Sequence, residues 1–337
     1  MIERTPTGQK LTGTAPAKVS RAMRHVAVIY NPASGQSFAR RKAAVDEVLD
    51  VLRQAGIEAD AFVTDTPGSA TVHAQQAVHE GYDAILACGG DGTVHEVLQS
   101  LVGTEVALGV IPLGTANALA ADLGLIASPA KATRTLLDAE RVRVPVGRIH
   151  FENGRGPDSR YFLVAAGVGA DALLMARLDP VLKRRFGYIL YLIEAARIWA
   201  TDPFPLFEAA FTTNGHGPDR VAQVSQLLAV RVRSFGGALR ELAPGASLRS
   251  RSLRLLAFGT RSRYSYLRFL LAVLAGRHTF AREIELVETA TVDCRPCNGS
   301  QHTLYVEADG EVLGHLPAKM ETVPNALTLL VPPGAQP

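Results

Sequence analysis

Apolar positions along the first half of the chain follow two alternating patterns. Short apolar runs are typical of buried strands, and four of them occur here: residues 26–30, 57–64, 83–88 and 106–111. Between them, apolar residues recur at helical spacing and predict helices over residues 37–54, over 69–80, from 94 to about 102 and after 117. Strands that alternate with helices indicate a parallel sheet with helices on its faces. In such sheets ligands bind beyond the carboxyl ends of the strands, where four polar residues fall: Asn31, Thr64, Asp91 and Thr115.

The pattern changes after about residue 144. Gly, Pro and Asn turns now separate strand-like runs: residues 161–166, 208–212, 226–232, 252–258, 283–289 and 303–308. These runs predict a second, mostly antiparallel β domain. Two basic and apolar segments, residues 180–200 and 261–278, are predicted as helices. Each could contact an anionic membrane surface or pack on the sheets, and their sequences do not separate the two alternatives.

The most informative loop is Gly-Gly-Asp-Gly-Thr at residues 89–93, between a predicted strand and a predicted helix. Thr93 and Glu96 have the spacing of a capping box, which would fix the start of the helix. Glycines let the backbone approach a bulky anion, and a helix N-terminus presents free N–H groups. Asp91 would then lie among phosphate-binding amides, where a divalent cation would offset its charge. A tight strand-to-helix turn is the alternative.

Composition narrows the class of protein. The chain has 337 residues, 47% of them hydrophobic, which is typical of a soluble globular protein of two domains. The net charge of +3 gives no support to nucleic-acid binding, and three cysteines suggest a reducing compartment. No apolar run reaches the roughly 18 residues of a membrane-spanning helix. Residues 1–23 are polar and lack the apolar core of a signal peptide, which predicts a disordered tail.

Other motifs are weaker. The Gly-x4-Gly-Lys-Ser/Thr phosphate loop is absent from the sequence. The Gly-x-Gly-x-x-Ala pattern at residues 167–172 lies outside the alternating region, so a tight turn is favoured over a dinucleotide site. Cys294 and Cys297 lack a second ligand pair and are interpreted as incidental rather than zinc-binding. Asp309-Gly310 is a hairpin signal, and the local sequence alone does not single out Glu311 as catalytic.

Four motifs in this order resemble the diacylglycerol kinase catalytic-domain family, which includes bacterial lipid kinases and the sphingosine and ceramide kinases. They are Asn-Pro-Ala-Ser-Gly at 31–35, Gly-Gly-Asp-Gly-Thr at 89–93, Pro-Leu-Gly-Thr-Ala-Asn at 112–117 and Asp-Gly-Glu at 309–311. The resemblance covers about residues 24–333. It implies an α/β fold with a doubly wound, parallel-sheet, nucleotide-binding domain like that of NAD kinases over residues 24–144. A β-sandwich-like lipid-substrate domain would follow over residues 145–317. Residues 318–333 would return to the first domain.

The resemblance also assigns roles to matching positions. Glu311 would be the general base on a lipid hydroxyl, and Asp91 would position Mg-ATP, contact its Mg²⁺ or itself act as the base. ATP contacts would come from Asn31, Pro32, Ala33, Ser34, Gly35, Thr64, Gly89, Gly90, Asp91, Gly92, Thr93, Val94, His95, Glu96, Gly114, Thr115 and Asn117.

One departure from the family concerns a structural magnesium. Bacterial lipid kinases often carry an Asp-Gly pair after a Pro-x-Ala turn, and this acid and nearby backbone help hold the ion. Here Pro-Gly-Ala at 244–246 is present, but Ser250 stands in place of the acid and Arg249, Arg251 and Arg254 surround it. A hard cation prefers anionic oxygens, so this second magnesium site is expected to be lost. The basic segment could instead meet a lipid phosphate.

The resulting expectation is an ATP-dependent lipid kinase of the diacylglycerol kinase type, cytoplasmic and peripherally attached to an anionic membrane. Ceramide or a sphingoid base is the alternative acceptor. Alternatives of another class are a soluble NAD kinase-type enzyme and a non-catalytic lipid- or nucleotide-binding protein. A homodimer is compatible with the sequence.

Overall fold

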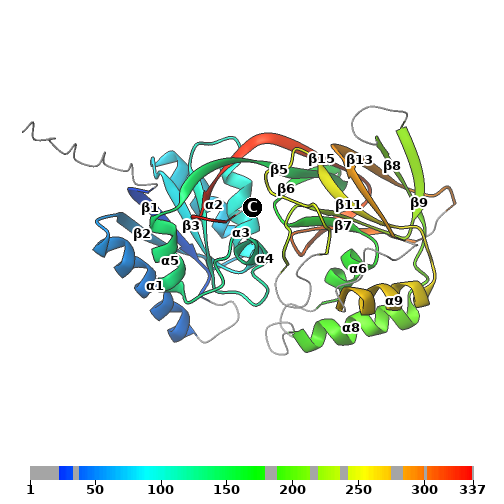
Figure 1. Ribbon diagram of the computed structural model, residues 1–337, viewed down its shortest axis with the longest axis horizontal. Coiled ribbons are helices and arrows are strands. Elements are labelled where there is room, and N and C mark those ends of the chain that lie inside the picture. The colour runs from blue at the N-terminus through cyan, green and yellow to red at the C-terminus, as the bar shows by residue number, and fades with distance from the viewer. Residues whose placement is uncertain are drawn as a thin grey trace, which may run out of the picture.

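The protein consists of two lobes that share one continuous sheet (Figure 1). The computed structural model describes residues 23–32, 38–178, 188–212, 219–235, 242–274, 284–299 and 302–335. The first lobe is a parallel sheet covered by helices, and the second is built mainly of antiparallel strands. This is the α/β arrangement that the sequence pattern predicts.

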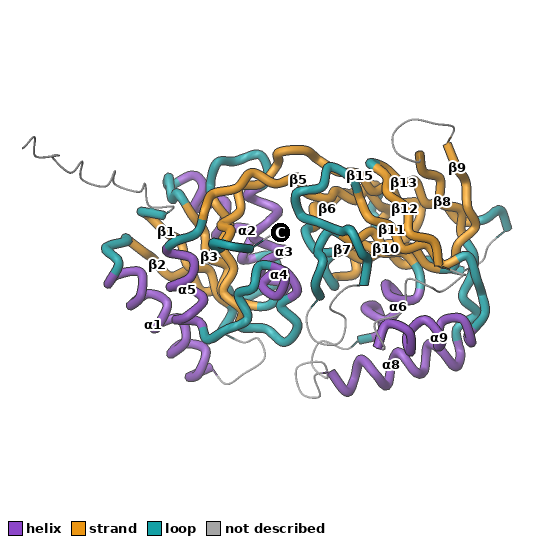
Figure 2. Tube along the Cα trace, viewed as in Figure 1, coloured by secondary structure: helices purple, strands orange, loops and turns teal. Residues whose placement is uncertain are grey.

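The first lobe contains four parallel strands in the order β4-β3-β1-β2. They are β1 (His25–Tyr30), β2 (Glu58–Val63), β3 (Ala84–Gly89) and β4 (Ala107–Pro112). Its helices are α1 (Phe38–Gln54), α2 (Ser69–His79), α3 (Asp91–Leu101), the short α4 (Ala118–Asp122) and α5 (Pro129–Leu137). Helices α1 and α5 contact each other and cover one side of the sheet, while α2 and α3 pack together on the other (Figure 2).

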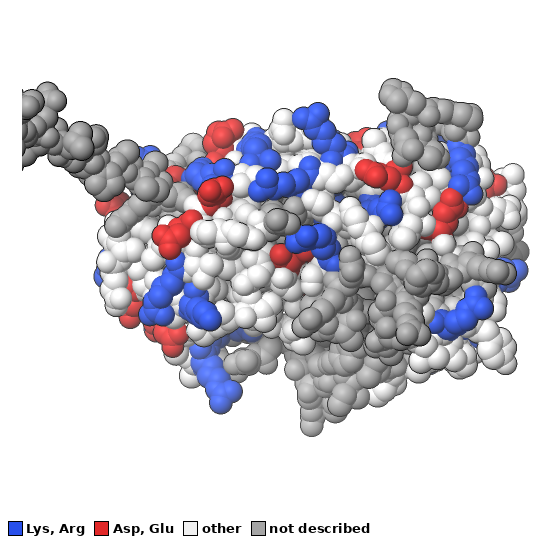
Figure 3. All heavy atoms as spheres, in the orientation of Figure 1, with Lys and Arg blue, Asp and Glu red and all other residues white. Residues whose placement is uncertain are grey.

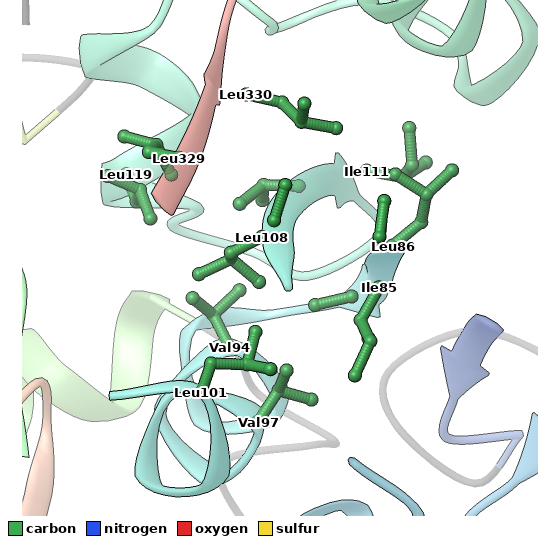
Figure 4. Packing of buried hydrophobic residues seen from close by; sticks show 14 of the residues in the cluster. Ile85, Leu86, Val94, Val97, Leu101, Leu108, Ile111, Leu119, Leu329 and Leu330 are labelled. Atoms are coloured by element: carbon green, nitrogen blue, oxygen red, sulfur yellow. The ribbon is translucent and has the colours of Figure 1, made fainter. Parts of the chain in front are cut away.

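The core of this lobe explains why α3 has a fixed position. Val94, Val97 and Leu101 repeat at helical spacing and point from α3 toward Ile85 and Leu108 of the central strands (Figure 4). Burying a side chain of this size contributes roughly 1.5–3 kcal/mol each. The start of α3, which follows the Gly-rich loop, is therefore held rigidly against the sheet.

The second lobe is formed by mostly antiparallel strands: β5 (Glu140–Glu152), β6 (Pro157–Phe162), β7 (Ala165–Val168), β8 (Phe207–Thr212), β9 (Asp219–Val224), β10 (Gln226–Val230), β11 (Leu253–Phe258), β12 (Ile284–Thr289), β13 (Thr291–Pro296) and β14 (Tyr305–Ala308). Three helices accompany them: α6 (Ala170–Arg177), α8 (Tyr188–Thr201) and α9 (Arg263–Leu274). The prediction of a single strand over residues 161–166 is wrong, because β6 ends at Phe162 and β7 begins at Ala165.

One long strand, β15 (Glu311–Val331), runs through both lobes. Its start forms a hairpin with β14, and its end lies parallel to β4, with Thr328 opposite Ala107. It also pairs along much of its length with β5, so the division expected at residue 144 falls inside a strand. Residues 318–333, which are expected to return to the first lobe, include the strand end that pairs with β4. Basic and acidic side chains are interspersed over the face in Figure 3, in keeping with the small net charge.

Candidate active site

The loop after β3 leads directly into α3, which begins at Asp91. Gly90 is the residue before the helix, and no side chain caps this end; the N–H groups of Thr93 and Val94 donate to its carbonyl oxygen. The predicted capping box is therefore wrong. The helix starts three residues earlier than the box requires, so Thr93 packs over Gly89 and the Glu96 carboxylate accepts a hydrogen bond from the Ala70 N–H at 3.1 Å.

Asp91 ties this loop to the loop after β4. Its two carboxylate oxygens accept hydrogen bonds from the N–H groups of Asn117 at 3.0 Å and Ala118 at 2.8 Å. The Asn117 amide in turn closes the loop by accepting from the Gly114 N–H at 2.9 Å and donating to the Gly114 carbonyl at 2.8 Å. Burial raises the pKa of Asp91, while the two N–H donors partly offset that effect. The two Gly-containing loops thus form one unit.

Two glycines of that unit touch each other. A Cβ on Gly114 would lie 2.4 Å from the Gly90 Cα, so this pair has no room for side chains. The N-terminus of α3, which no side chain caps, begins beside this pair, and a helix N-terminus is suited to phosphate.

Glu311 reaches the same place from the opposite lobe. It follows the β14–β15 hairpin turn, in which Asp309 (φ 50°) and Gly310 (φ 83°) both have positive φ angles, as the Asp-Gly signal predicts. Glu311 Oε1 lies 2.9 Å from the position that a Cβ on Gly92 would take. An exposed carboxylate therefore stands over the N-terminal turn of α3, although more than two hundred residues separate the two in sequence.

The turn that carries Glu311 is fixed by Asp309. The carboxylate of Asp309 accepts hydrogen bonds from the N–H groups of Leu163 at 3.0 Å, Val164 at 2.8 Å and Ala165 at 3.1 Å. The His95 ring on α3 contacts the same carboxylate at 3.4 Å, and both side chains are 4% exposed. Burial alone would lower the pKa of His95, but its hydrogen bond to Asp309 and the charges of Asp309 and Glu311 raise it overall. A buried pair thus connects α3 to the turn.

Family models match both lobes of the chain. Residues 25–149 match the family described as "Diacylglycerol kinase catalytic domain", and residues 163–331 match the "YegS C-terminal NAD kinase beta sandwich-like domain". A protein named diacylglycerol kinase from Mycobacterium tuberculosis is 30% identical over 312 residues, which span 91% of this chain and 95% of the relative. The chain belongs to the diacylglycerol kinase family.

Other relatives support the same assignment. A Bacillus subtilis protein named diacylglycerol kinase is 27% identical to this family member over 92% of this chain and 97% of the relative. A crystal structure of a putative diacylglycerol kinase from Bacillus anthracis superposes with a TM-score of 0.74 at 20% identity, covering 96% and 99% of the two chains. A sequence identity of 20% shows only that this structure and the present chain share a fold.

The remaining residues that are expected to contact the nucleotide follow the carboxyl ends of the strands of the first lobe. Asn31 and Pro32 follow β1, Thr64 is buried after β2 with its N–H on the Tyr30 carbonyl, and Thr115 is exposed. Ala33, Ser34 and Gly35 lie outside the described residues. The side chains of Val94, His95 and Glu96 face the core, Asp309 and α2, so only their backbone would be offered to a nucleotide.

Two buried acids behind the turn are not indicated by the sequence. Glu307 of β14 lies opposite Gly167 of β7, and its carboxylate accepts a hydrogen bond from the Gly310 N–H at 2.9 Å. The Asp171 carboxylate lies over the same Gly167, where an added Cβ would come within 2.0 Å of Asp171 Oδ2. Burial raises the pKa of Asp171 to about 6, and burial together with the nearby Asp171 raises the pKa of Glu307. Gly167 thus makes room for a carboxylate, and Gly169 (φ 117°) forms a strand-to-helix turn.

We expect Asp171→Asn to stabilise this kinase-family member in a pH-dependent way. The unfolded carboxyl has a pKa of about 3.9, so between about pH 4 and 6 only the folded state keeps the proton, and the stability of the wild type falls as the pH rises. Asparagine cannot ionise and escapes this loss. The variant's gain in Tm should be near zero at about pH 4 and reach a plateau above about pH 6 in thermal denaturation. A gain that is the same at both pH values would contradict the buried titration. Asp46→Asn, on the exposed face of α1, is the control.

The sequence pattern does not indicate the structural role of Asp309. A hairpin turn accounts for an Asp-Gly pair completely at the local level, and the three N–H groups that need an acceptor belong to residues more than 140 positions away. The available signal in the sequence is that Asp309 precedes the proposed catalytic Glu311 by two positions, which could have suggested that Asp309 positions it.

Proposed function

We propose that this protein is an ATP-dependent lipid kinase that transfers the γ-phosphoryl group of ATP to a lipid hydroxyl, with diacylglycerol as the leading acceptor. The observation that carries the proposal is the position of the Glu311 carboxylate over Gly92 and the N-terminal turn of α3. It brings a proton acceptor to the phosphate-binding end of a helix, which is the arrangement that transfer to an alcohol requires.

Each part of the site has a separate task in this proposal. The N–H groups at the start of α3 bind the ATP phosphates, and Asp91 keeps the 114–117 loop beside them. Asp309 and His95 hold the turn so that Glu311 can accept the proton of the lipid hydroxyl, or orient it. Phosphoryl transfer depends mainly on such positioning and on neutralising charge.

Magnesium fits the chemistry of this site. Asp91 would supply carboxylate oxygens, the donors that Mg²⁺ prefers, and nucleotide phosphates would supply the rest. The ion would neutralise phosphate charge during transfer. The oxygens of Asp91 each accept one N–H, so its first task is to hold the loop.

The acceptor is tested by incubating the purified chain with radiolabelled ATP and a total lipid extract, followed by mass identification of the product. Labelled phosphatidic acid would support diacylglycerol, whereas a phosphorylated ceramide or sphingoid base would replace it with the alternative acceptor. A parallel reaction with NAD in place of lipid completes the assay. Label in NADP alone, or in no product at all, would contradict a lipid kinase.

We also propose that α8 and α9 rest on an anionic membrane. Five apolar side chains on the two helices are exposed: Ile193, Trp199, Tyr264, Leu267 and Leu271. Arg197, Arg263 and Arg268 are exposed beside them, and the two helices lie together along one border of the second lobe (Figure 1). Amphipathic helices with this composition bind lipid surfaces.

Lys183, Arg184, Arg185 and Arg277, which also suggested membrane contact, lie outside the described residues. Within the described part of the chain, no helix has the length and hydropathy needed to span a bilayer.

Leu271→Glu should weaken this attachment without affecting the fold, because the side chain is 57% exposed. A charge at that position opposes burial in the lipid and repels anionic headgroups. We expect the fraction of protein that floats with phosphatidylglycerol vesicles to fall several-fold, while Val221→Glu, at an equally exposed position on β9, should leave it unchanged. Equal flotation of the two variants would place the membrane contact elsewhere.

A further inference from the structure

An arginine is fully buried in the second lobe. Arg231 follows β10 and is 1% exposed, and its backbone N–H donates to the Val164 carbonyl at 2.9 Å. The hydrogen bonds of its guanidinium among the described residues go to backbone carbonyls and not to carboxylates. A buried cation is costly unless its donors find acceptors. The contacts of this side chain therefore need a specific explanation.

One guanidinium nitrogen, Nη2, is bound by carbonyl oxygens, while Nε and Nη1 are buried without a hydrogen-bond partner among the described residues. Arg231 Nη2 donates to the carbonyl of Pro145 at 2.9 Å, of Leu248 at 3.1 Å and of Ser250 at 3.3 Å. These oxygens come from β5 and from the segment between residues 242 and 252. Carbonyl oxygens that converge on one point form the kind of cage that holds a hard cation.

The family resemblance expects a magnesium ion in this segment, and the residues present do not fit one. The Ser250 side chain is occupied, since its Oγ contacts Ser252 Oγ at 2.8 Å and accepts from the Ser252 N–H at 3.1 Å. Among the described residues no group of three or more acid, histidine or cysteine side chains is placed to hold a metal ion, and the space between the three carbonyls is taken by a charged nitrogen.

We propose that the Arg231 guanidinium is a built-in replacement for a structural divalent cation, binding the Pro145, Leu248 and Ser250 carbonyls that such an ion would bind. The chain thereby joins β5 to the 242–252 segment without a metal, and its fold does not depend on magnesium.

The charge of Arg231 also reaches the turn that carries Glu311. Burial lowers the pKa of Arg231 to about 10, and the negative charge of Asp309 acts in the opposite direction. The side chain therefore remains a cation at neutral pH, within electrostatic range of Asp309. Two residues that follow Arg231 in the sequence contact the first lobe. The backbone N–H groups of Arg233 and Ser234 donate to the Asp122 carboxylate on α4, at 2.9 and 3.0 Å. The segment that carries Arg231 thus contacts the helix after the second Gly-containing loop.

The test measures the stability of the nucleotide-free protein, so it does not depend on the proposed activity. After EDTA treatment and dialysis, we expect the Tm of the wild type to be the same with and without millimolar Mg²⁺. An ion bound at a hundred times its Kd would raise the Tm of a chain of this size by about 4 °C. A rise of that size in the wild type would overturn the proposal.

Arg231→Met removes the cation and leaves the three carbonyls without a donor. We expect its Tm to fall by about 4 °C or more. The matched control is Arg254→Met, which removes an arginine that donates to the single Pro244 carbonyl at 2.9 Å in the same segment. Equal losses in the two variants would contradict a special role for Arg231.

A double variant separates a cation site from ordinary packing. Arg231→Met combined with Ser250→Asp supplies a carboxylate to the emptied carbonyl cage, and its Tm should rise on addition of Mg²⁺ while that of Arg231→Met does not. An unresponsive double variant would show that the carbonyls do not form a cation site. If Arg231→Met fails to fold, Arg231→Lys keeps a cation at the same place, and a wild-type-like Tm that is insensitive to Mg²⁺ is then expected.

Discussion

Glu311→Gln is expected to reduce phosphoryl transfer to lipid by about 10²–10⁴-fold, the usual contribution of a general base. Glutamine has nearly the same shape but cannot accept the hydroxyl proton. The side chain at the start of β15 should keep its position over Gly92, because the Asp309 carboxylate holds the turn. ATP affinity should therefore change little.

The measurement is steady-state transfer from radiolabelled ATP to lipid, combined with ATP affinity by titration calorimetry. Glu321→Gln, farther along the same strand and paired with His150 at 3.0 Å, is the matched control and should keep wild-type transfer. If Glu311→Gln lost ATP affinity yet kept its turnover per bound nucleotide, the carboxylate would be a nucleotide contact and the general-base assignment would be wrong.

Asp91→Ala should abolish measurable turnover through a different cause. The change removes the acceptor for the N–H groups of Asn117 and Ala118, so the loop at 114–117 loses its attachment to the start of α3. Leaving such donors unpaired costs about 1–3 kcal/mol each in stability when they are buried. We expect ATP affinity, turnover and Tm all to fall, with the fold retained.

This combination of losses distinguishes two roles for Asp91. A residue that acts only as the base would lose turnover while ATP affinity and Tm stayed at wild-type values, and that result would contradict the loop-holding role. Asp46→Ala removes an exposed acid that pairs with Lys42 on α1 and controls for the loss of one negative charge. Near-normal lipid phosphorylation by Asp91→Ala would show that this loop is not part of the active site.

The sequence predicts the first lobe well because its structure follows from local pattern. The runs at 26–30 and 83–88 are long enough and apolar enough to be buried strands, and the helices between them show a clear apolar stripe. The hairpin at Asp309-Gly310 is equally local, since both residues must adopt positive φ angles. The capping box failed because two residues with suitable spacing found other partners in three dimensions.

The hydrogen bonds that fix the buried Asp309 and Arg231 could not be predicted in the same way. Asp309 is bound by N–H groups of Leu163, Val164 and Ala165, and Arg231 by carbonyls of residues 145, 248 and 250. Backbone groups are present at every position and leave no trace in the sequence. Resemblance to a family supplied the role of Glu311, and only the structure shows what holds it in place.

Strand β15 has a consequence for how the chain folds as it is synthesised. The edge of β4 in the first lobe is covered by residues close to the C-terminus, where Thr328 and Leu329 lie opposite Ala107 and Leu108. Domains usually fold one after another, starting from the N-terminus, as the chain leaves the ribosome. Here that order cannot be completed, because the first lobe lacks an inner strand until the end of β15 has been made. An exposed strand edge is a site for aggregation. Until β15 has been made, the edge of β4 is exposed in this way, and the nascent first lobe is open to pairing with other chains.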